Sequence, residues 1–555
     1  MLKGKDFFVR ACAAILLLRL FTPTFFSNEY AIVRQELSNL MVSGLIFVLW
    51  LVFAVWKFWC REHLERTIFD LSIAILLGAV FLSLTQSVYL CSSLKFAVQL
   101  VSCVLFFHIL VNVLETRKDL SNFLFLIFIP AAAIVFLSIW EYSFGDNFQG
   151  HSYKRVGSLF GYPNVLAGYL MLVIPLAWAA LITASEIWEK RVAAVWMAVL
   201  LLAFSLTLSF LCSINFIIAT VILTPLIAKQ WLGKSVDKKI YWAIGASVVI
   251  FLIFIVVIRG DLVLYPRLEY LRVACLLLKD NPWFGTGADT FEIVSPQYVT
   301  YFQGFSAYVH NSYLQLWVET GILGLIAMLL FIGAFVKSAA AALKATKEHN
   351  RRVFLIAFIW ALSAFFIDNM SSFTMLRPDA ALFWWATLAG YVSLIRKEQS
   401  QQTYPWKSSR VFLILFSIVA AVAIAVNVRS SIALFNYQQG LTDFLQRDID
   451  MALVSVQQAE EIDPQDEHFF AAAGLVYINK YLMTKDPHYL EDAEKSFKKA
   501  ARLSPHFCDN YVFLSKIAWE QKDKVKLEQY MKQVQKLCPL KYASLKKELM
   551  GKKQP

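Results

Sequence analysis

His310 stands next to Asn311 at the start of a long apolar run, a place where a side chain can do acid–base chemistry. An imidazole titrates near neutral pH, so it can take a proton from a hydroxyl group as a general base. Arg155, Arg267 and Arg272 precede it in polar segments, and the planar guanidinium group binds phosphate or carboxylate oxygens in pairs. These residue types predict a site that holds an anionic, phosphate-bearing substrate and removes a proton.

Membrane helices must position these residues, since 58% of the chain is hydrophobic and only 17% is charged. A helix that crosses a bilayer needs about 20 mainly apolar residues, because backbone polar groups cannot stay unsatisfied in hydrocarbon. The sequence therefore predicts an all-α, polytopic membrane protein of about 12–13 transmembrane helices. The predicted runs are 8–27, 39–58, 68–88, 95–114, 120–141, 164–185, 192–210, 212–230, 240–258, 311–336, 353–369, 378–395 and 411–428.

Basic loops alternate with nearly uncharged loops between these runs. The positive-inside bias predicts a cytoplasmic N-terminus, with Lys3 and Lys5, and after thirteen spans an extracytoplasmic C-terminus. The formal charge of +12 then reflects topology and predicts no nucleic-acid partner. The first run has no small-residue cleavage site, so we expect a retained helix and not a signal peptide.

Two domains are predicted: a transmembrane domain over 1–428, with outer loops at 142–163 and 259–310, and an extracytoplasmic domain over 430–555. Lys and Arg are scarce on the outer side, so the arginines of these loops need a local reason, and phosphate binding is one. The structural alternative is that they extend to lipid headgroups or pair with Asp146, Asp261 or Glu269. For His310 the alternative is a helix-entry residue bonded to backbone or lipid.

The tail resembles tetratricopeptide repeats, which are helix hairpins of 34 residues with small, aromatic and proline residues at set positions. Gly474 and Phe497 occupy such positions, and Pro505 and Pro539 are one 34-residue period apart. Repeat arrays bind extended partners in a groove, so a protein partner is expected here, with a helical cap that has no partner as the alternative. Cys508 and Cys538 start and end one predicted hairpin, and could form a disulfide if this side is oxidising.

Three segments carry a family resemblance: residues 155–167 (RVGSLFGYPNVLA), 265–291 (which include YPRLEYLR and DNPWFGTGADTF) and 310–324 (HNSYLQLWVETGILG). Together they resemble the O-antigen ligase and O-antigen polymerase family, the Wzy/ligase-type transferases of lipid-linked glycans. The resemblance covers roughly residues 60–395 and is most specific in the segment that begins at His310. Gly285 and Gly287 fit a turn there, because the third glycine of a dinucleotide-binding loop is missing.

The resemblance implies a GT-C-like fold and a glycosyltransferase in the bacterial cytoplasmic (inner) membrane. A polyprenyl-diphosphate-linked glycan would enter from the membrane, and an acceptor hydroxyl would attack its anomeric carbon. By position, His310 is then the catalytic residue, and Arg155, with Arg267 or Arg272, binds the diphosphate. The supporting polar groups would be Asn164, Asn311, Tyr313 and Glu319. We see no metal-binding constellation near His310, so the expected chemistry needs no metal and no cofactor.

One departure from the family pattern leaves alternatives open. The family commonly has a Ser-Arg-Gly element in a middle membrane helix, but residues 206–215 (LTLSFLCSIN) contain no arginine. Either the arginines of the outer loops replace it, or activity is altered and the chain is a non-catalytic membrane scaffold. The acceptor is open between lipid A core, another glycan repeat unit and a protein hydroxyl, the last being protein O-oligosaccharyltransferase activity. A transporter of lipid-linked sugars is less favoured, since neither inverted repeats nor broken helices are detected.

Overall fold

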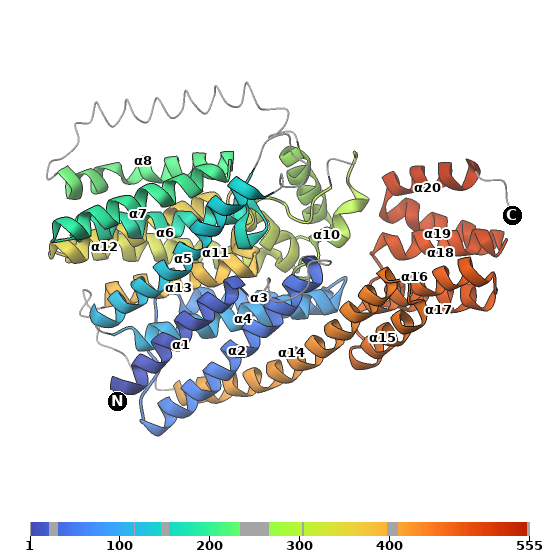
Figure 1. The fold of residues 1–555 in the computed structure, drawn as a ribbon, viewed down its shortest axis with the longest axis horizontal. Coiled ribbons are helices and arrows are strands. Elements are labelled where there is room, and N and C mark those ends of the chain that lie inside the picture. The colour runs from blue at the N-terminus through green and yellow to red at the C-terminus, as the bar shows by residue number, and fades with distance from the viewer. Residues whose placement is uncertain are drawn as a thin grey trace.

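The computed structural model describes residues 2–21, 31–115, 117–145, 155–232, 266–301, 305–396 and 409–551. These residues form α-helices and short 3-10 helices, with no strand among them, so the predicted all-α class is confirmed. Most helices run along the long axis of the molecule, and the C-terminal helices gather at one end (Figure 1). The chain begins at the opposite end, near the start of α1 (Leu2–Phe21).

Eight helices in the described residues are long and apolar enough to cross a membrane, which confirms the prediction of a polytopic membrane protein. The sequence property behind them is a run of about 20 apolar residues, as a bilayer requires. They lie within α2 (Ala31–Trp59), α4 (Leu90–Val113), α5 (Arg117–Phe144), α6 (Pro163–Thr183), α8 (Phe210–Leu232), α11 (Ser312–Ala345), α12 (His349–Asp368) and α14 (Ser409–Leu445).

Five of the predicted runs are not among these eight. The run at 240–258 lies outside the described residues. The other four form α1, α3 (Asp70–Ser83), α7 (Ile187–Leu206) and α13 (Pro378–Arg396). With 14 residues, α3 alone is too short to cross about 30 Å of hydrocarbon, and α1 and α7 contain several charged residues. The predicted total of 12–13 spans therefore depends on these five runs.

The break between α7 and α8 lies at 207–209, not at 210–212 as predicted. The Thr207 hydroxyl donates to the Phe204 carbonyl (2.7 Å) and accepts from the Ser209 amide (3.1 Å). Leu208 between them has a φ of 46°, outside the helical region. A side-chain hydroxyl that takes over backbone hydrogen bonds ends a helix without any polar run, so hydropathy alone misplaced the turn.

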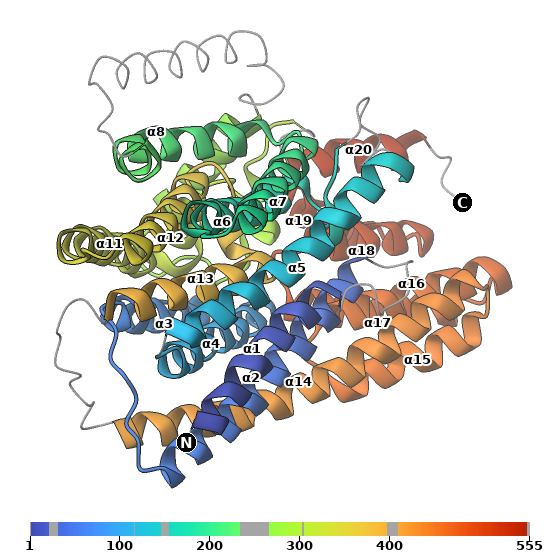
Figure 2. The same ribbon diagram turned by 60° about the vertical axis from the view of Figure 1, so that its left-hand side comes forward.

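The C-terminal domain is a series of helix hairpins that begins with the end of α14. This helix continues unbroken through 428–430, where the domain boundary was predicted, and packs along α15 (Ile449–Ile462) (Figure 2). Next come α16 (Glu467–Thr484), α17 (His488–Leu503), α18 (Cys508–Glu520), α19 (Lys524–Leu537) and α20 (Pro539–Gly551). A Cβ on Gly474 would come within 2.5 Å of the Phe497 ring, so glycine permits the close approach of α16 and α17. Assignment to the tetratricopeptide class stays a prediction.

Cys508 and Cys538 do come together, as their places in the predicted hairpin required. Both are buried free thiols in one hydrophobic cluster, and the two side chains form a hydrogen bond. The proposed oxidation to a disulfide stays a prediction.

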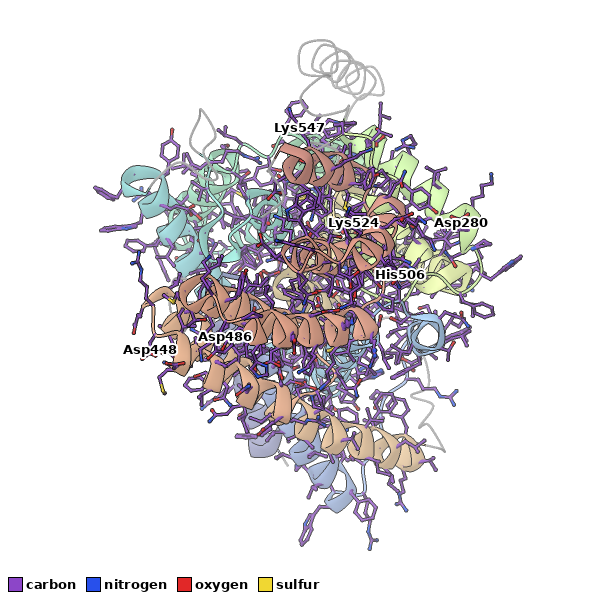
Figure 3. All side chains as sticks on the ribbon, turned by 90° about the vertical axis from the view of Figure 1, so that its right-hand side faces the viewer. Asp280, Asp448, Asp486, His506, Lys524 and Lys547 are labelled. Carbon is purple, nitrogen blue, oxygen red and sulfur yellow. The ribbon has the colours of Figure 1, made fainter. Side chains whose placement is uncertain are left out.

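The end of the C-terminal domain also covers part of the segment 266–310. Leu540 packs against a cluster that includes Val273 and Val299, and α19 contacts the 3-10 helix η5 (Ser295–Gln297). Figure 3 looks onto this end of the molecule and labels Asp280, His506 of the turn between α17 and α18, and Lys524 at the start of α19. The two parts of the chain are thus packed against each other, beyond their connection through α14.

Two glycines let the loop after the helix over 266–280 pack directly on the backbone of α11. Gly321 has a φ of 72°, which kinks α11, and the nearby Val318 and Glu319 carbonyls accept from the amides of Thr286 and Gly287 (3.0 Å each). Gly285, with a φ of 73°, lies so close that a Cβ would be 2.4 Å from the Glu319 carbonyl. The predicted turn at 285–287 is confirmed, and its function is close packing.

We expect Gly285→Ala to lower the thermal unfolding midpoint of the detergent-solubilised protein. Left-handed backbone alone costs a non-glycine residue about 1–3 kcal/mol, and the clash with Glu319 adds to this. Gly333→Ala is the matched control in α11, because nothing lies within 4 Å of a Cβ there. Fluorescence-detected size-exclusion chromatography after heating measures both variants. Equal midpoints for the two variants would contradict the packing described here.

Candidate functional site

Arg155 connects the start of α6 to the break between α7 and α8 through hydrogen bonds. Its Nε donates to the Thr207 carbonyl (3.1 Å), and its Nη2 donates to Oδ1 of Asn164 (3.0 Å). The Ser209 hydroxyl donates to the same Asn164 oxygen (2.8 Å). Two predicted site residues are therefore in direct contact. The stretch that lacks the expected arginine receives the Arg155 guanidinium instead.

Arg267, near the start of the helix over 266–280, is a half-buried cation close to Arg155. Burial lowers its pKa, Cys212, Tyr270 and Asp368 act in the opposite direction, and the positive charge of Arg155 lowers it further. Its Nε is buried and has no hydrogen-bond partner within the described part of the chain. A buried donor without a partner is costly, so Arg267 is a candidate for binding an anion.

His310 lies between two aromatic rings, close to Arg267. Its imidazole stacks on Tyr270 with ring centres 5.3 Å apart and meets Phe373 edge-on at 4.9 Å. Burial, and then the charge of Arg267, lowers the pKa of His310 to about 3. This lowered pKa contradicts the expectation that the imidazole titrates near neutral pH. Among the described residues, its buried Nδ1 has no hydrogen-bond partner.

The backbone of His310 is held in the left-handed region, at a φ of 57°, by anchored neighbours. Val309 donates its amide to the Gln315 side chain (3.1 Å), and Asn311 caps α11 by accepting from the Leu314 amide (3.0 Å). The Ser312 hydroxyl donates to Asn369 (2.7 Å). Strain of this kind costs about 1–3 kcal/mol and persists only where the surroundings enforce it, which is typical of functional sites.

The remaining predicted supporting residues hold structure and do not face the histidine ring. Tyr313 donates its hydroxyl to the Phe366 carbonyl (2.7 Å). Glu319 accepts from the amides of Asp289 (3.0 Å) and Phe291 (3.3 Å) and from the Gln315 side chain (2.9 Å). The carboxylate thus fastens the loop that follows the helix over 266–280 to α11.

Arg272 is not brought to this cluster. Its guanidinium binds Glu269 through two hydrogen bonds (2.6 and 2.7 Å) and donates to the Tyr298 carbonyl (2.5 Å). Glu269 also accepts from the amide and hydroxyl of Thr300 (3.0 and 2.9 Å). The structural alternative stated for the outer arginines, pairing with Glu269, therefore describes Arg272, whereas Arg155 and Arg267 remain candidates for binding the diphosphate.

Two further polar groups belong to this region and were missed from the sequence. Asp368, at the end of α12, is buried and accepts from Asn215 (3.1 Å) close to Arg267. Arg377 pairs with Asp379 (2.9 Å) and with the Tyr308 hydroxyl, and the Tyr308 ring stacks on Phe373 at 4.2 Å. The sequence held a signal for both residues, because charged residues next to apolar runs need a local partner.

Residues 164–329 match the family model described as O-Antigen ligase. The O-antigen ligase domain so defined contains Asn164, Arg267, His310 and Glu319, and supports the resemblance found in the sequence motifs. Arg155 and the C-terminal helical domain lie outside it. No curated protein matches the chain.

We expect Glu319→Gln to destabilise the protein. An amide can accept at only one of the two positions where the carboxylate accepts, so at least one buried donor would lose its partner, at a cost of about 1–3 kcal/mol. The thermal unfolding midpoint measures this, with the exposed Glu528→Gln as the control (Glu528 side chain 72% exposed). An unchanged midpoint for Glu319→Gln would show that the hydrogen bonds of Glu319 to the loop do not stabilise the protein.

Proposed function

We propose that the protein is a glycosyltransferase of cell-surface polysaccharide assembly. It transfers or polymerises a polyprenyl-diphosphate-linked glycan onto an acceptor hydroxyl at the outer face of the bacterial cytoplasmic membrane. The proposal includes the predicted orientation, with a cytoplasmic N-terminus and an extracytoplasmic C-terminus. The observation that carries it is that two groups lie close together. One is the Arg267 guanidinium, whose buried Nε has no hydrogen-bond partner among the described residues, and the other is the His310 imidazole, whose pKa the Arg267 charge helps to lower.

The reaction follows from the charges of these two groups. The diphosphate binds at Arg267 and Arg155, and the neutral imidazole of His310 accepts the proton of the acceptor hydroxyl. The hydroxyl oxygen forms a bond to the anomeric carbon, and the bond from this carbon to the diphosphate oxygen breaks. The electron pair leaves with the diphosphate, so negative charge grows beside the arginines, where it is stabilised most strongly in the transition state.

Arg155 takes the place of the arginine that residues 206–215 lack. Its hydrogen bond to the Thr207 carbonyl supports this assignment, because it holds the guanidinium at the same stretch of chain. This favours an active enzyme over the non-catalytic scaffold. We further propose that the chemistry is independent of metal ions, since arginines supply the positive charge. The acceptor is a glycan, a lipid or a protein, and the helical-repeat domain is a candidate site for a protein partner.

We expect His310→Ala and Arg267→Met to abolish surface polysaccharide in the source bacterium while the protein level stays normal. Lipid-linked precursor should accumulate, because its transfer is blocked. Removal of a general base typically costs a factor of about 10²–10⁴ in rate. Immunoblotting, polysaccharide staining and mass spectrometry of extracted lipids measure the three quantities.

Two variants serve as controls for that experiment. Arg272→Gln removes a guanidinium that pairs with Glu269, and His349→Gln changes an exposed histidine at the start of α12, so both should retain polysaccharide. Normal polysaccharide with His310→Ala would remove the catalytic assignment and favour the scaffold.

The pH dependence should differ between kcat/KM and kcat. In the free enzyme the pKa of His310 is about 3, so the active neutral form persists as pH falls and kcat/KM should show no acidic limb near pH 6.5. A bound diphosphate adds negative charge next to the ring and raises this pKa, so the acidic limb of kcat should lie at higher pH. Release of polyprenyl diphosphate from labelled lipid-linked glycan measures both. An acidic limb of kcat/KM centred near 6.5 would contradict the burial of the ring.

A further inference from the structure

A cavity of about 260 Å³ lies where the membrane helices meet the C-terminal domain. It is lined by side chains of α4 and α14, by Leu40 of α2, by Asp463 and Gln465 of the loop between α15 and α16, and by Leu503. Its lining residues are not those of the cluster around His310. A ligand here would therefore not be the substrate bound at that cluster.

Along α14 the lining of this cavity changes from apolar to polar, because Val426 precedes Asn427, Arg429 and Ser430 on the way to the C-terminal domain. Along α4 apolar and charged side chains alternate, with Lys95 between Leu94 and Val98. The cavity thus offers apolar surface next to charged and polar groups. An amphiphile with a polar headgroup and acyl chains needs both kinds of surface.

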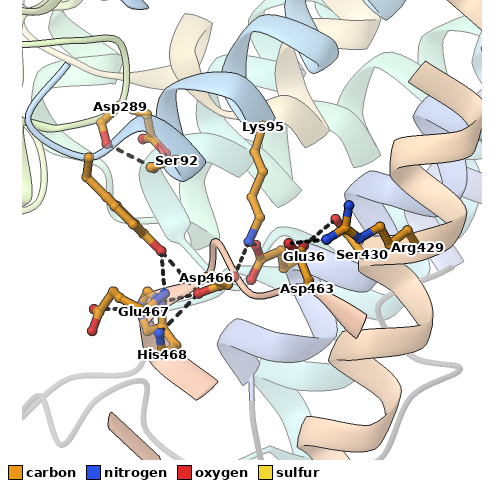
Figure 4. Close-up of polar contacts among 11 residues, drawn as sticks. Glu36, Ser92, Lys95, Asp289, Arg429, Ser430, Asp463, Asp466, Glu467 and His468 are labelled. Carbon is orange, nitrogen blue, oxygen red and sulfur yellow. Dashed lines mark hydrogen bonds and ion pairs between the residues drawn. The ribbon is translucent and has the colours of Figure 1, made fainter. Parts of the chain in front are cut away.

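One basic group of the lining is already neutralised. Lys95 forms ion pairs with Glu36 and with Asp466 (2.7 Å), and Tyr89 donates its hydroxyl to Asp466 (3.1 Å). Figure 4 shows this network, with Arg429, Ser430 and Asp463 beside it. Arg429 has a half-exposed side chain whose Nε donates to the Ile462 carbonyl (2.5 Å). Its Nη2 lies 3.8 Å from Asp463, which is long for an ion pair. A guanidinium with this exposure can bind a phosphate group through two N–H donors.

Hydrogen-bond acceptors lie next to the donors of Arg429. The Nδ2 of Asn427 donates to the Leu40 carbonyl (3.2 Å) and to Ser43 (2.8 Å). Because a carbonyl only accepts, this contact fixes which end of the amide is the nitrogen. The buried Oδ1 of Asn427 is left without a partner in the residues that the structure describes. The Asp463 carboxylate accepts from the Ser430 hydroxyl (2.9 Å), and its other oxygen, Oδ1, lies 3.8 Å from Arg429. Together with the Asn427 oxygen, this carboxylate offers acceptors for a donor that carries positive charge.

We propose that this cavity binds a zwitterionic phospholipid with an ethanolamine headgroup. The phosphate meets Arg429, and the ammonium, with its three donors, meets Asp463 and Asn427. An acyl chain lies against Leu94, Val98 and Val426. Since Arg429 is on α14 and Asp463 follows α15, the bound headgroup joins the membrane helix to the C-terminal domain.

Native mass spectrometry of the full-length protein in detergent, with added phosphatidylethanolamine or phosphatidylglycerol, tests this proposal. We expect one retained phosphatidylethanolamine per chain and weaker retention of phosphatidylglycerol. Val426→Trp fills the cavity and should abolish retention. Leu415→Trp, at an exposed position of the same helix, should not change it. Arg429→Gln should weaken binding about tenfold, as expected for the loss of a charge-assisted hydrogen bond.

Equal retention by Val426→Trp and Leu415→Trp would show that the lipid is only annular, and would overturn the proposal. Equal or tighter binding of phosphatidylglycerol would overturn the assignment of a zwitterionic headgroup. Should Val426→Trp fail to elute as a single species, Arg429→Gln, a substitution at an exposed side chain, decides alone: unchanged retention rejects the site.

Discussion

A buried carboxylate in α11 determines the relative position of the two halves of the candidate site. Glu319 binds the amides of Asp289 and Phe291, in the loop that leads away from the helix carrying Arg267. Nine residues earlier in the chain, His310 stands at the entry to α11 itself. The helix over 266–280 and the start of α11 are therefore parts of one hydrogen-bonded unit. The glycines at 285 and 321 are required because the two backbones are in contact.

Burial determines the protonation of the groups in this unit. Arg267 and His310 are held close together, and Nε of Arg267 and Nδ1 of His310 are buried. Desolvation favours the neutral imidazole, whereas the guanidinium keeps its charge. An anion would complement the charge of Arg267. Packing around the two residues stabilises this arrangement, including the contacts of Tyr270 and Phe373 with the imidazole ring.

Much of the candidate site could be predicted from sequence because its parts lie at recognisable boundaries. Arg155 and Asn164 flank the entry to a membrane helix, and they are in contact in the folded chain. Sequence spacing could not separate Arg267 from Arg272, since both lie on one short helix with Glu269 between them. Only the fold shows that Arg272 pairs with Glu269 whereas Arg267 lies near His310. Asp368 and Arg377 were missed for a related reason: Asn215 and Tyr308, which they contact, are distant in the chain.

The sequence by itself determined the all-helical membrane architecture, the turn at 285–287 and the residue types of the site. These properties depend on local composition: apolar runs must form helices in a bilayer, and short glycine-rich segments favour turns. Tertiary structure alone decided which arginine lies beside His310 and in which direction the pKa of His310 shifts. Each of those depends on desolvation and on contacts between residues far apart in the chain, and neither quantity is contained in a local pattern.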